Sequence, residues 1–517
     1  ERFQHPQHAL EMLSNGSEPL NTAFFRPALG GDLAALRGMA KFLLQWHREA
    51  LTNGEPAVFD LAFIAEHTHG VDDYLALLDA SSWASLVEQS GLSLDELKHA
   101  ALLYRRAERV IICWAMGITQ HHNSVATIQE IVNLQLLRGN LGRPGAGLCP
   151  VRGHSNVQGD RTMGINERPS AAFLDALEQR FNFQVPRAQG HNTVEAINAM
   201  LDGQAKVFIG LGGNFAQATP DSPRSHAALS RCALTVQIST KLNRSHLTTG
   251  ADALILPCLG RTDIDQQAGG PQAVTVEDSF SMIHASYGQL EPLSAQMRSE
   301  PAIIAGIAKA TLGNHPVDWD ALIADYRRIR ELIAETIPGF SDFNQRLQHP
   351  GGFYLGNAAA ERRWLTASHK ANFKANPLPA DLLPPQVRST GQTPDLILQT
   401  LRSHDQYNTT IYGLDDRYRG VKGQRQVLFV NEADILRLGF QPGQQVDIQS
   451  IWDDGIERKV EGFTLLAFDI PAGQAAAYYP EANPLVPLQS FGTGSFTPTS
   501  KYVAIRLQAH QAAARIL

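Results

Sequence analysis

The chain has 517 residues, of which 43% are apolar and 18% are charged. This is an ordinary globular composition, so a large core is expected, in roughly three domains at ~150 residues each, and disorder is not. The formal net charge of −7, from 44 basic and 51 acidic residues, argues against a general nucleic-acid-binding protein, whose surface would be basic.

The hydropathy pattern and the cysteine content exclude further classes of protein. No window approaches the ~18 consecutive apolar residues of a membrane helix, so we predict no membrane span. The four cysteines contain no C-x-x-C pair, and they therefore offer neither a local zinc or iron–sulfur pattern nor a disulfide scaffold. A reducing compartment, the cytoplasm, is expected. Cys113 and Cys258 lie in or beside apolar runs, and we interpret them as buried structural thiols.

The first part of the chain is predicted to be mostly helical. Apolar residues recur at helical spacing over 32–44. Ser93 followed by Glu96 fits a capping box, which marks the start of another helix. The apolar run 109–114 then predicts a strand, and 125–137 predicts a further helix.

Three more apolar runs, 206–211, 233–238 and 253–256, predict strands, with helical spacing from about residue 222 between the first two. Strands that alternate with helices favour a parallel sheet covered by helices. Ligands of such sheets bind at the carboxyl ends of the strands, so the residues after each run are candidates for binding. Residues 300–345 are predicted to be helical again.

The sequence pattern changes near the C-terminus, from helical spacing to short apolar runs. Residues 375–394 contain five prolines and are interpreted as a linker or crossing loop. Many short strands separated by turns then favour a β-barrel. Those strands are expected at residues 396–401, 427–430, 445–451, 460–466, 475–479 and 502–507.

The segment 117–164 is the most distinctive. Its glycines leave the backbone free to approach a ligand closely. Three of its arginines, Arg138, Arg143 and Arg152, can bind phosphates in a bidentate manner. Its side-chain amide and imidazole groups can bind a heterocycle. Taken alone, these residues also fit a glycine-rich surface loop with solvated arginines.

This segment, GITQHHNS (117–124) and NLQLLRGNLGRPGAGLCPVRGHSNVQGDRTMG (133–164), resembles the molybdopterin oxidoreductases of the dimethyl-sulfoxide-reductase superfamily. It is most similar to the formate-dehydrogenase-like group and its YdeP-like branch, which is linked to acid resistance. The similarity extends over nearly the whole chain. It continues through FIAEHTHGVDDY (63–74), GLGGNFAQATPD (210–221), TGADALILP (249–257), VNEADILRLGFQPGQQVDIQS (430–450) and TPTSKYVAIRL (497–507).

The resemblance implies an α/β fold. Parallel sheets of the dinucleotide-binding type, covered by helices, are followed by a C-terminal six-stranded double-psi-type β-barrel. The implied segments are 1–115, the second half of an α/β domain; 116–260, an α/β domain contacting a guanine dinucleotide; 261–374, a return to the first domain with helices; 375–394, the proline-rich linker; and 395–517, the molybdopterin-dinucleotide-binding barrel. The metal ligand, with an iron–sulfur cluster, is expected in a preceding N-terminal portion, so this chain alone is expected to be inactive.

The implied cofactor is molybdenum bis(molybdopterin guanine dinucleotide). The matching positions in the glycine-rich segment are Gly117, Thr119, Gln120, His121, Arg152, Gly153, Asn156 and Gln158. Those after the later strands are Gly212, Gly213, Asn214, Thr219, Ser239, Thr240 and Lys241, where helix capping is the alternative for the hydroxyls. Those in the barrel are Arg402, His404, Gln406, Asn408, Thr409, Asn483 and Lys501, where a polar turn and a surface lysine are the alternatives. No catalytic residue and no metal ligand is assigned.

The function implied by the resemblance is a molybdenum-dependent oxidoreductase. Two electrons pass between the metal and a small substrate, formate or a similar molecule, and leave through an electron-transfer partner. Two other hypotheses stay open. One is a cofactor-free structural module of an electron-transfer complex, which the intact glycine and polar residues of 117–159 disfavour. The other is an inactive truncated fragment.

Overall fold

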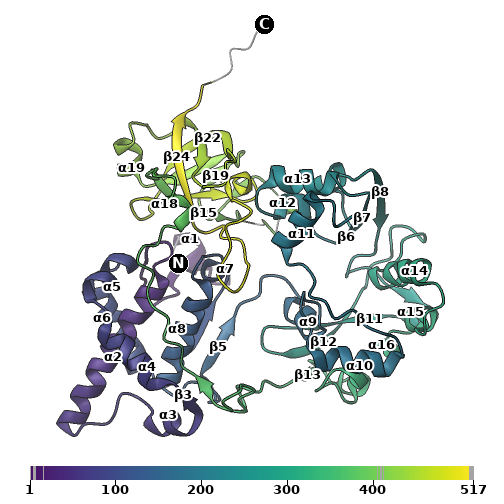
Figure 1. The fold of residues 1–517 in the computed structure, drawn as a ribbon, viewed down its shortest axis with the longest axis horizontal. Helices are drawn as coiled ribbons and strands as arrows, with labels where there is room; N and C mark the ends of the chain where they lie inside the picture. The colour runs from purple at the N-terminus through teal and green to yellow at the C-terminus, as the bar shows by residue number, and fades with distance from the viewer. Residues whose placement is uncertain are drawn as a thin grey trace.

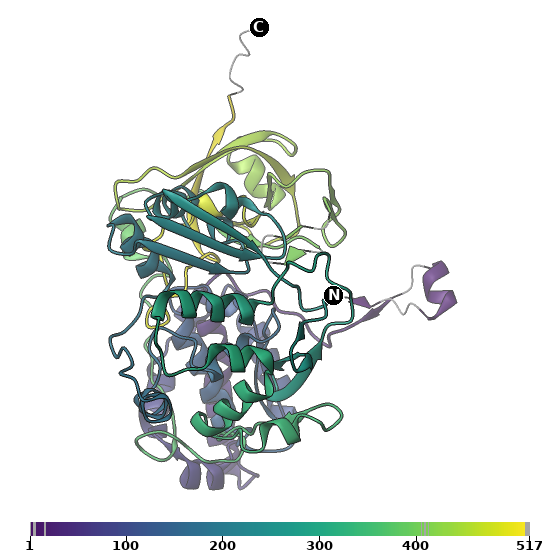
Figure 2. The same ribbon diagram turned by 90° about the vertical axis from the view of Figure 1, so that its right-hand side faces the viewer.

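The computed structural model describes residues 2–3, 7–14, 17–404, 406–407, 410–411 and 413–511. Figure 1 shows four lobes: a helical lobe (32–150, joined by 371–373), a mixed lobe (157–181 and 266–355), a sheet lobe (193–257) and the barrel (396–509). The sheet lobe and the barrel lie side by side, and both views agree on this (Figures 1 and 2). Segments far apart in the sequence therefore lie next to one another in the fold.

The helical lobe is built around one long helix, α2, whose buried face includes Leu33, Leu43 and Leu44. The capping box predicted at Ser93 and Glu96 is present at the start of α6. The helices of this lobe are α2 (Asp32–Asn53), α3 (Leu61–His67), α4 (Val71–Ala80), α5 (Trp83–Ser90), α6 (Leu94–Arg106), α7 (Met116–Thr119) and α8 (Ser124–Leu137).

Two short parallel strands complete this lobe, β4 (Ile111–Trp114) and β5 (Gly147–Pro150). The side-chain amide of Gln135, from α8, donates to the Val110 and Gly147 carbonyls at the start of the two strands. This pairing crosses the domain limit expected at residue 115, and the domain limits stay a prediction.

Cys113 lies on β4 and is exposed, so its interpretation as a buried thiol is wrong, whereas Cys258 is buried. The apolar run correctly predicted a strand, but β4 pairs with β5 alone among the described strands, and its side chains alternate between a covered and an uncovered face.

The sheet lobe contains a three-stranded parallel sheet in the order β6–β7–β8. Its strands, β6 (Val207–Leu211), β7 (Leu234–Ser239) and β8 (Asp252–Pro257), fall on the predicted runs. The helices of this lobe, α11 (Thr193–Leu201), α12 (Phe215–Ala218) and α13 (Ser222–Ser230), share an apolar cluster with Phe208 of β6. Ile303 and Ile307 of the mixed lobe pack against β7 and β8.

The mixed lobe confirms the helices expected over 300–345 and adds a sheet that the sequence did not predict. The helices are α9 (Val157–Thr162), α10 (Ala171–Phe181), α14 (Glu300–Leu312), α15 (Trp319–Ala324), α16 (Arg327–Thr336) and α17 (Phe343–Arg346). The added sheet is antiparallel, β11 (Ala273–Glu277), β12 (Met282–Tyr287) and β13 (Phe353–Tyr354).

The C-terminal part is a closed six-stranded barrel in the order β15–β23–β20–β22–β21–β24. Its core is almost fully dry, with Leu398, Val446 and Leu465 at 0% exposure. The predicted strands are all present, as β15 (Leu396–Leu401), β20 (Val427–Val430), β21 (Gln445–Ser450), β22 (Lys459–Ala467), β23 (Gln474–Tyr478) and β24 (Val503–Ala509), with α18 (Pro385–Arg388) before them and α19 (Glu432–Arg437) after β20. The α/β class with parallel sheets and a six-stranded barrel is therefore confirmed.

Shorter elements decorate these lobes. They are β1 (Arg2–Phe3), α1 (Ala9–Ser14), β2 (Glu18–Pro19), β3 (Thr68–His69), η1 (Arg244–Leu247), β9 (Gln266–Gln267), β10 (Gly270–Pro271), β14 (Ala371–Asn372), β16 (Gln406–Tyr407), β17 (Thr410–Ile411), β18 (Asp415–Asp416), β19 (Val421–Lys422) and η2 (Asn483–Leu485). No helix of the described ranges combines the length and apolar character that crossing a membrane requires.

Candidate cofactor-binding site

The glycine-rich segment leaves the helical lobe at the carboxyl ends of β4 and β5. Because the two strands are parallel and Trp114 pairs with Pro150, the segments that follow them begin at the same edge. After β4 the chain forms α7, which contains Gly117 and Thr119, and then reaches Gln120 and His121. After β5 it passes through Arg152 and Gly153 to α9.

Two glycines at this edge have no role in the packing of the described residues. A Cβ placed on Gly117 or on Gly153 would meet no atom of the other described residues within 4 Å, and neither glycine has a positive φ. Gly139 and Gly142 differ, because both have positive φ and a Cβ would come within 2.5 Å of Asp60 and 2.4 Å of Arg362. Packing and backbone conformation thus explain Gly139 and Gly142, and leave Gly117 and Gly153 bordering open space.

Gln120 and His121 bring this edge against the barrel. The Gln120 carbonyl accepts the Lys501 backbone N–H at 3.2 Å, and the His121 ring lies edge-on to Tyr502 with centroids 6.3 Å apart. Only 8% of His121 is exposed, and its Nδ1 has no hydrogen-bond partner among the described residues. Burial lowers the pKa of His121 to about 4, so the ring is neutral near pH 7. A neutral ring with an unsatisfied nitrogen suits a polar heterocycle.

Of the other polar residues of the segment, some stabilise the fold and some lie at the surface. Asn156 adopts φ +64°, and its side-chain oxygen accepts the Glu277 N–H at 3.0 Å. Gly159 is required by this arrangement, because a Cβ there would lie 2.0 Å from the same oxygen. Arg152 and Gln158 stay at the surface, joined by a 3.3 Å hydrogen bond. Asn156 therefore ties the segment to the mixed lobe.

The turn after β6 has a backbone that only glycine adopts readily. Gly212 and Gly213 have φ of +70° and +71°, and a Cβ on Gly213 would meet none of the described atoms within 4 Å. Asn214 accepts a hydrogen bond from Ser245, and Asn243 donates to the Gly213 carbonyl, so a neighbouring loop braces the turn. The turn is thus fixed by hydrogen bonds to the 243–245 loop, while the side of Gly213 where a Cβ would lie is open.

The remaining candidates of the sheet lobe are less suggestive. Thr219 is buried directly after α12, and its hydroxyl donates to the carbonyl of Phe215, the first residue of that helix. This bond lies within the fold but is not the N-cap that the alternative predicted. Ser239 ends β7, where Thr240 and Lys241 follow, and the last two are exposed. Nothing in the fold requires Lys241 at its position.

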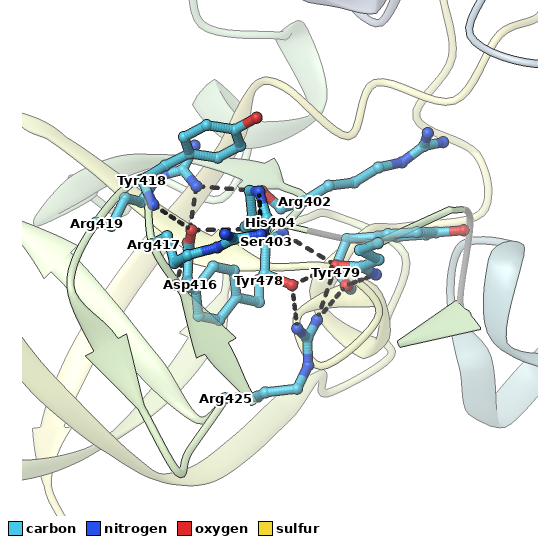
Figure 3. A network of polar contacts seen from close by, with 11 residues as sticks. Arg402, Ser403, His404, Asp416, Arg417, Tyr418, Arg419, Arg425, Tyr478 and Tyr479 are labelled. Atoms are coloured by element: carbon cyan, nitrogen blue, oxygen red, sulfur yellow. Dashed lines mark hydrogen bonds and ion pairs between the residues drawn. The ribbon is translucent and has the colours of Figure 1, made fainter. Parts of the chain in front are cut away.

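In the barrel, a polar network gathers residues of 402–425 around one buried carboxylate (Figure 3). Asp416 accepts hydrogen bonds from the His404 N–H, Arg419 and the Tyr478 hydroxyl, at 3.2, 2.9 and 2.6 Å. Burial alone would raise the pKa of Asp416, but the bonds from Tyr478 and Arg419 lower it. The carboxylate is thus kept ionised and holds the loop after β15.

A second arginine, Arg425, holds the other side of this loop. It pairs with Glu481 at 2.7 Å and donates to Gln406 at 3.1 Å and to the Tyr479 carbonyl at 2.8 Å. The Arg402 guanidinium lies 5.8 Å from the centre of the Tyr479 ring. The predicted residues Asn408 and Thr409 lie outside the described residues.

Lys501 is half-buried among positive charges. It donates to the Thr400 carbonyl, and burial together with Arg402 and Arg419 lowers its pKa to about 8. Arg402 and Arg419 place positive charge around its ammonium group, so the site favours a bound anion. The surface-lysine alternative is therefore wrong for Lys501.

Asn483 joins lobes. Its side chain donates to the Gln217 carbonyl at 2.7 Å, and its own carbonyl accepts the Asp221 N–H at 3.1 Å. Beside it, Arg458 and Asp221 form an ion pair at 2.8 Å in which both side chains are 2% exposed. The sheet lobe and the barrel are therefore locked together beside the candidate site.

Comparison with known proteins decides the family. Residues 43–257 match the family model described as "Molybdopterin oxidoreductase". An uncharacterized oxidoreductase of Mycobacterium tuberculosis is 50% identical over 98% of the chain, and protein YdeP of Escherichia coli is 45% identical over 98%. The chain belongs to the molybdopterin oxidoreductases.

The chain spans 64% and 66% of the lengths of these two relatives. A shorter similarity, 35% identity over 135 residues, links it to formate dehydrogenase H of Escherichia coli and covers 26% of this chain and 18% of that protein. Among solved structures, acetylene hydratase from Pelobacter acetylenicus aligns with 94% of this chain and 71% of its own, with a TM-score of 0.60 and 14% identity. This last similarity shows the fold.

The residues of this chain, as a member of that family, fit an anionic pterin. The open glycines, the unsatisfied His121 and the positive surroundings of Lys501 all belong to the region between the glycine-rich segment and the barrel. Within the described ranges, no group of three histidine, cysteine or acidic side chains is arranged to hold a metal ion. The chain thus offers groups that suit the organic part of the cofactor.

Sequence analysis missed the arginines that organise the barrel side of this site. Arg417, Arg419 and Arg425 fall within nine residues, and this basic cluster was the available signal. Arg458 and Asp221 had no such signal, because they are 237 residues apart in the sequence.

Proposed function

We propose that this chain is the molybdopterin-guanine-dinucleotide-binding portion of a molybdenum-dependent oxidoreductase. The observation that carries the proposal is the meeting of the Gln120–His121 turn with Lys501, beside glycines that the fold itself does not require. The bound cofactor supplies two-electron redox chemistry at its metal. The residues of this chain bind and orient it.

Each group has a separate role in this proposal. Gly117 and Gly153 let the backbone approach the cofactor, while Gln120 and His121 hydrogen-bond a pterin. Lys501, with Arg402, neutralises its negative charge. In the sheet lobe, the open turn at Gly212–Asn214, followed by Ser239, Thr240 and Lys241, faces the dinucleotide arm.

The substrate and partners follow from similarity and are equally proposals. The likeness to formate dehydrogenase H supports formate or a similar small molecule as substrate. An electron-transfer partner would carry the electrons away. A role in acid resistance and a cytoplasmic location stay predictions.

The test is the composition of the natural full-length product, purified anaerobically from its host. We expect about one molybdenum and two acid-released GMP per chain, the stoichiometry of the bis-dinucleotide cofactor. Tungsten in place of molybdenum would retain the binding assignment and change the metal. Substrate screening would begin with formate.

A folded product that holds neither metal nor GMP, from a host that makes the cofactor, would overturn the proposal. A cofactor-free structural module would then be the better hypothesis. The variants K501M and H121Q serve as paired probes, because both alter the proposed pterin contacts. Exposed Lys309, which pairs with Asp320 in the mixed lobe, provides the matched control K309M.

A further inference from the structure

Two of the four cysteines are direct neighbours in the helical lobe. Cys113 of β4 and Cys149 of β5 are paired residues in the parallel register, and both are free thiols. Neighbouring strands lie about 4.8 Å apart, which is within the Cα separation that a disulfide spans. The Cys113 side chain contacts the Cys149 thiol closely enough to raise its pKa.

The two thiols also share one face of the sheet. On the same strands, Ile112 and Leu148 pack against the apolar core of the helical lobe. Side chains alternate along a strand, so Cys113 and Cys149 project from the opposite face. Cys113 is exposed there, whereas Cys149 is 8% exposed.

We propose that Cys113 and Cys149 are a modification site, at which a peroxide-class oxidant forms a reversible intramolecular disulfide. The exposed Cys113 thiol loses its proton and its sulfur attacks one oxygen of hydrogen peroxide. The O–O bond breaks, a sulfenic acid remains, and the released hydroxide takes up that proton as one water. The Cys149 sulfur then attacks the Cys113 sulfur, the S–S bond forms and the hydroxyl leaves as a second water. Two thiols lose two electrons in total and one peroxide gains them.

The surroundings assign the order of these two steps. Burial, with the Cys113 contact, raises the pKa of Cys149, so this thiol is protonated near pH 7 and is poorly suited to meet the oxidant first. It is well placed to resolve the sulfenic acid, because the two sulfurs are held together by the strands and need not diffuse. The disulfide would sit immediately before the segments that contain Gly117 and Gly153.

The remaining cysteines provide an internal control. Cys232 and Cys258 are each 1% exposed and lie in other apolar clusters of the sheet lobe. Neither belongs to the β4–β5 pair. The variant C232A/C258A therefore retains the proposed site while it removes the other two thiols.

The test begins with the reduced wild-type chain, exposed to hydrogen peroxide near pH 7, alkylated and mapped by non-reducing mass spectrometry. We expect one linked peptide pair that joins Cys113 to Cys149, lighter by two hydrogens and restored by dithiothreitol. C232A/C258A should form the same bond. In C149S, dimedone should label Cys113 as a sulfenic acid.

The proposal fails if the wild-type chain keeps both thiols at a peroxide dose that lets dimedone label Cys113 in C149S. It fails equally if the only disulfide found joins two chains. Where C149S does not fold, dimedone labelling of Cys113 in the wild-type chain without a bond to Cys149 overturns the proposal equally. The test does not depend on bound cofactor, and its failure would leave the proposed function untouched.

Discussion

The barrel and the sheet lobe are built from similar short apolar runs and yet bury them differently. All four residues of β20, Val427–Val430, are buried, whereas Val207, Ile209 and Leu211 of β6 are 53%, 46% and 53% exposed. The barrel closes on itself and has no edge strand, while the three-stranded sheet has two edges and an uncovered face. An apolar run therefore predicts a strand, but closure of the sheet decides how much that strand stabilises the protein.

The largest expected effect tests this difference directly. Phe463→Ala removes a 1%-exposed ring from the barrel core and should cost about 4 kcal/mol of unfolding free energy. Ile209→Ala removes a half-exposed side chain from β6 and should cost about 1 kcal/mol or less. Urea unfolding, followed by hydrogen exchange of peptides from each region, measures both. Equal losses at the two positions would contradict the comparison.

The second effect concerns the contact between the two regions. Asp221→Asn leaves the buried Arg458 guanidinium with Asp454 as its remaining carboxylate partner. Breaking a buried pair of this kind should cost about 3 kcal/mol, because the remaining charge is poorly solvated. Hydrogen exchange should accelerate in both α13 and β22.

The double variant D221N/R458M serves as its control. Replacing both partners removes the buried guanidinium. It leaves Asp454 without its ion pair, but that side chain is 18% exposed, so the double variant should be more stable than D221N alone. If D221N is as stable as the wild type, Asp454 suffices for Arg458, and the lobes are held by their apolar contacts.

The sequence predicted local elements well and long-range contacts poorly. The barrel strands were predictable because each is an apolar run of strand length bounded by turn residues. The sheet β11–β13 was missed because β13, Phe353–Tyr354, is two residues long and pairs with a strand about 70 residues earlier. For the site, positions were available from family resemblance, but side-chain direction was not. Asn156, Thr219 and Asn483 turn towards the protein's own backbone, and this depends on tertiary packing.

The third prediction sharpens the contrast between stabilising and binding residues. Lys501 has a pKa of about 8 in the folded state against its usual 10.5. The unfolded chain binds this proton more tightly between pH 8 and pH 10.5, so this group lowers stability below pH 8, and the loss is relieved as pH rises. K501M should therefore be more stable than the wild type by about 3 kcal/mol at pH 7.

The pH dependence separates this effect from ordinary packing. The advantage of K501M should shrink through pH 8–10 and vanish above it, as measured by urea unfolding of both proteins across that range. An advantage that does not change with pH would mean that the methionine simply packs better. Bound cofactor should reverse the order of stability, because the anion then compensates the buried charge.

The smallest effect on stability carries the most information about function. Gly153→Ala should change the unfolding free energy by less than about 0.5 kcal/mol, because Gly153 lacks a positive φ and the new methyl meets none of the described atoms within 4 Å. Gly213→Ala is the matched variant, with equal space but a φ of +71°, and should cost about 1 kcal/mol through backbone strain. If the cofactor approaches the backbone at Gly153, the added methyl should reduce the GMP and metal retained by the full-length protein while its stability stays unchanged. Full retention in Gly153→Ala would show that the open space beside this glycine lies away from the cofactor, and would move the proposed contact to the barrel side of the site.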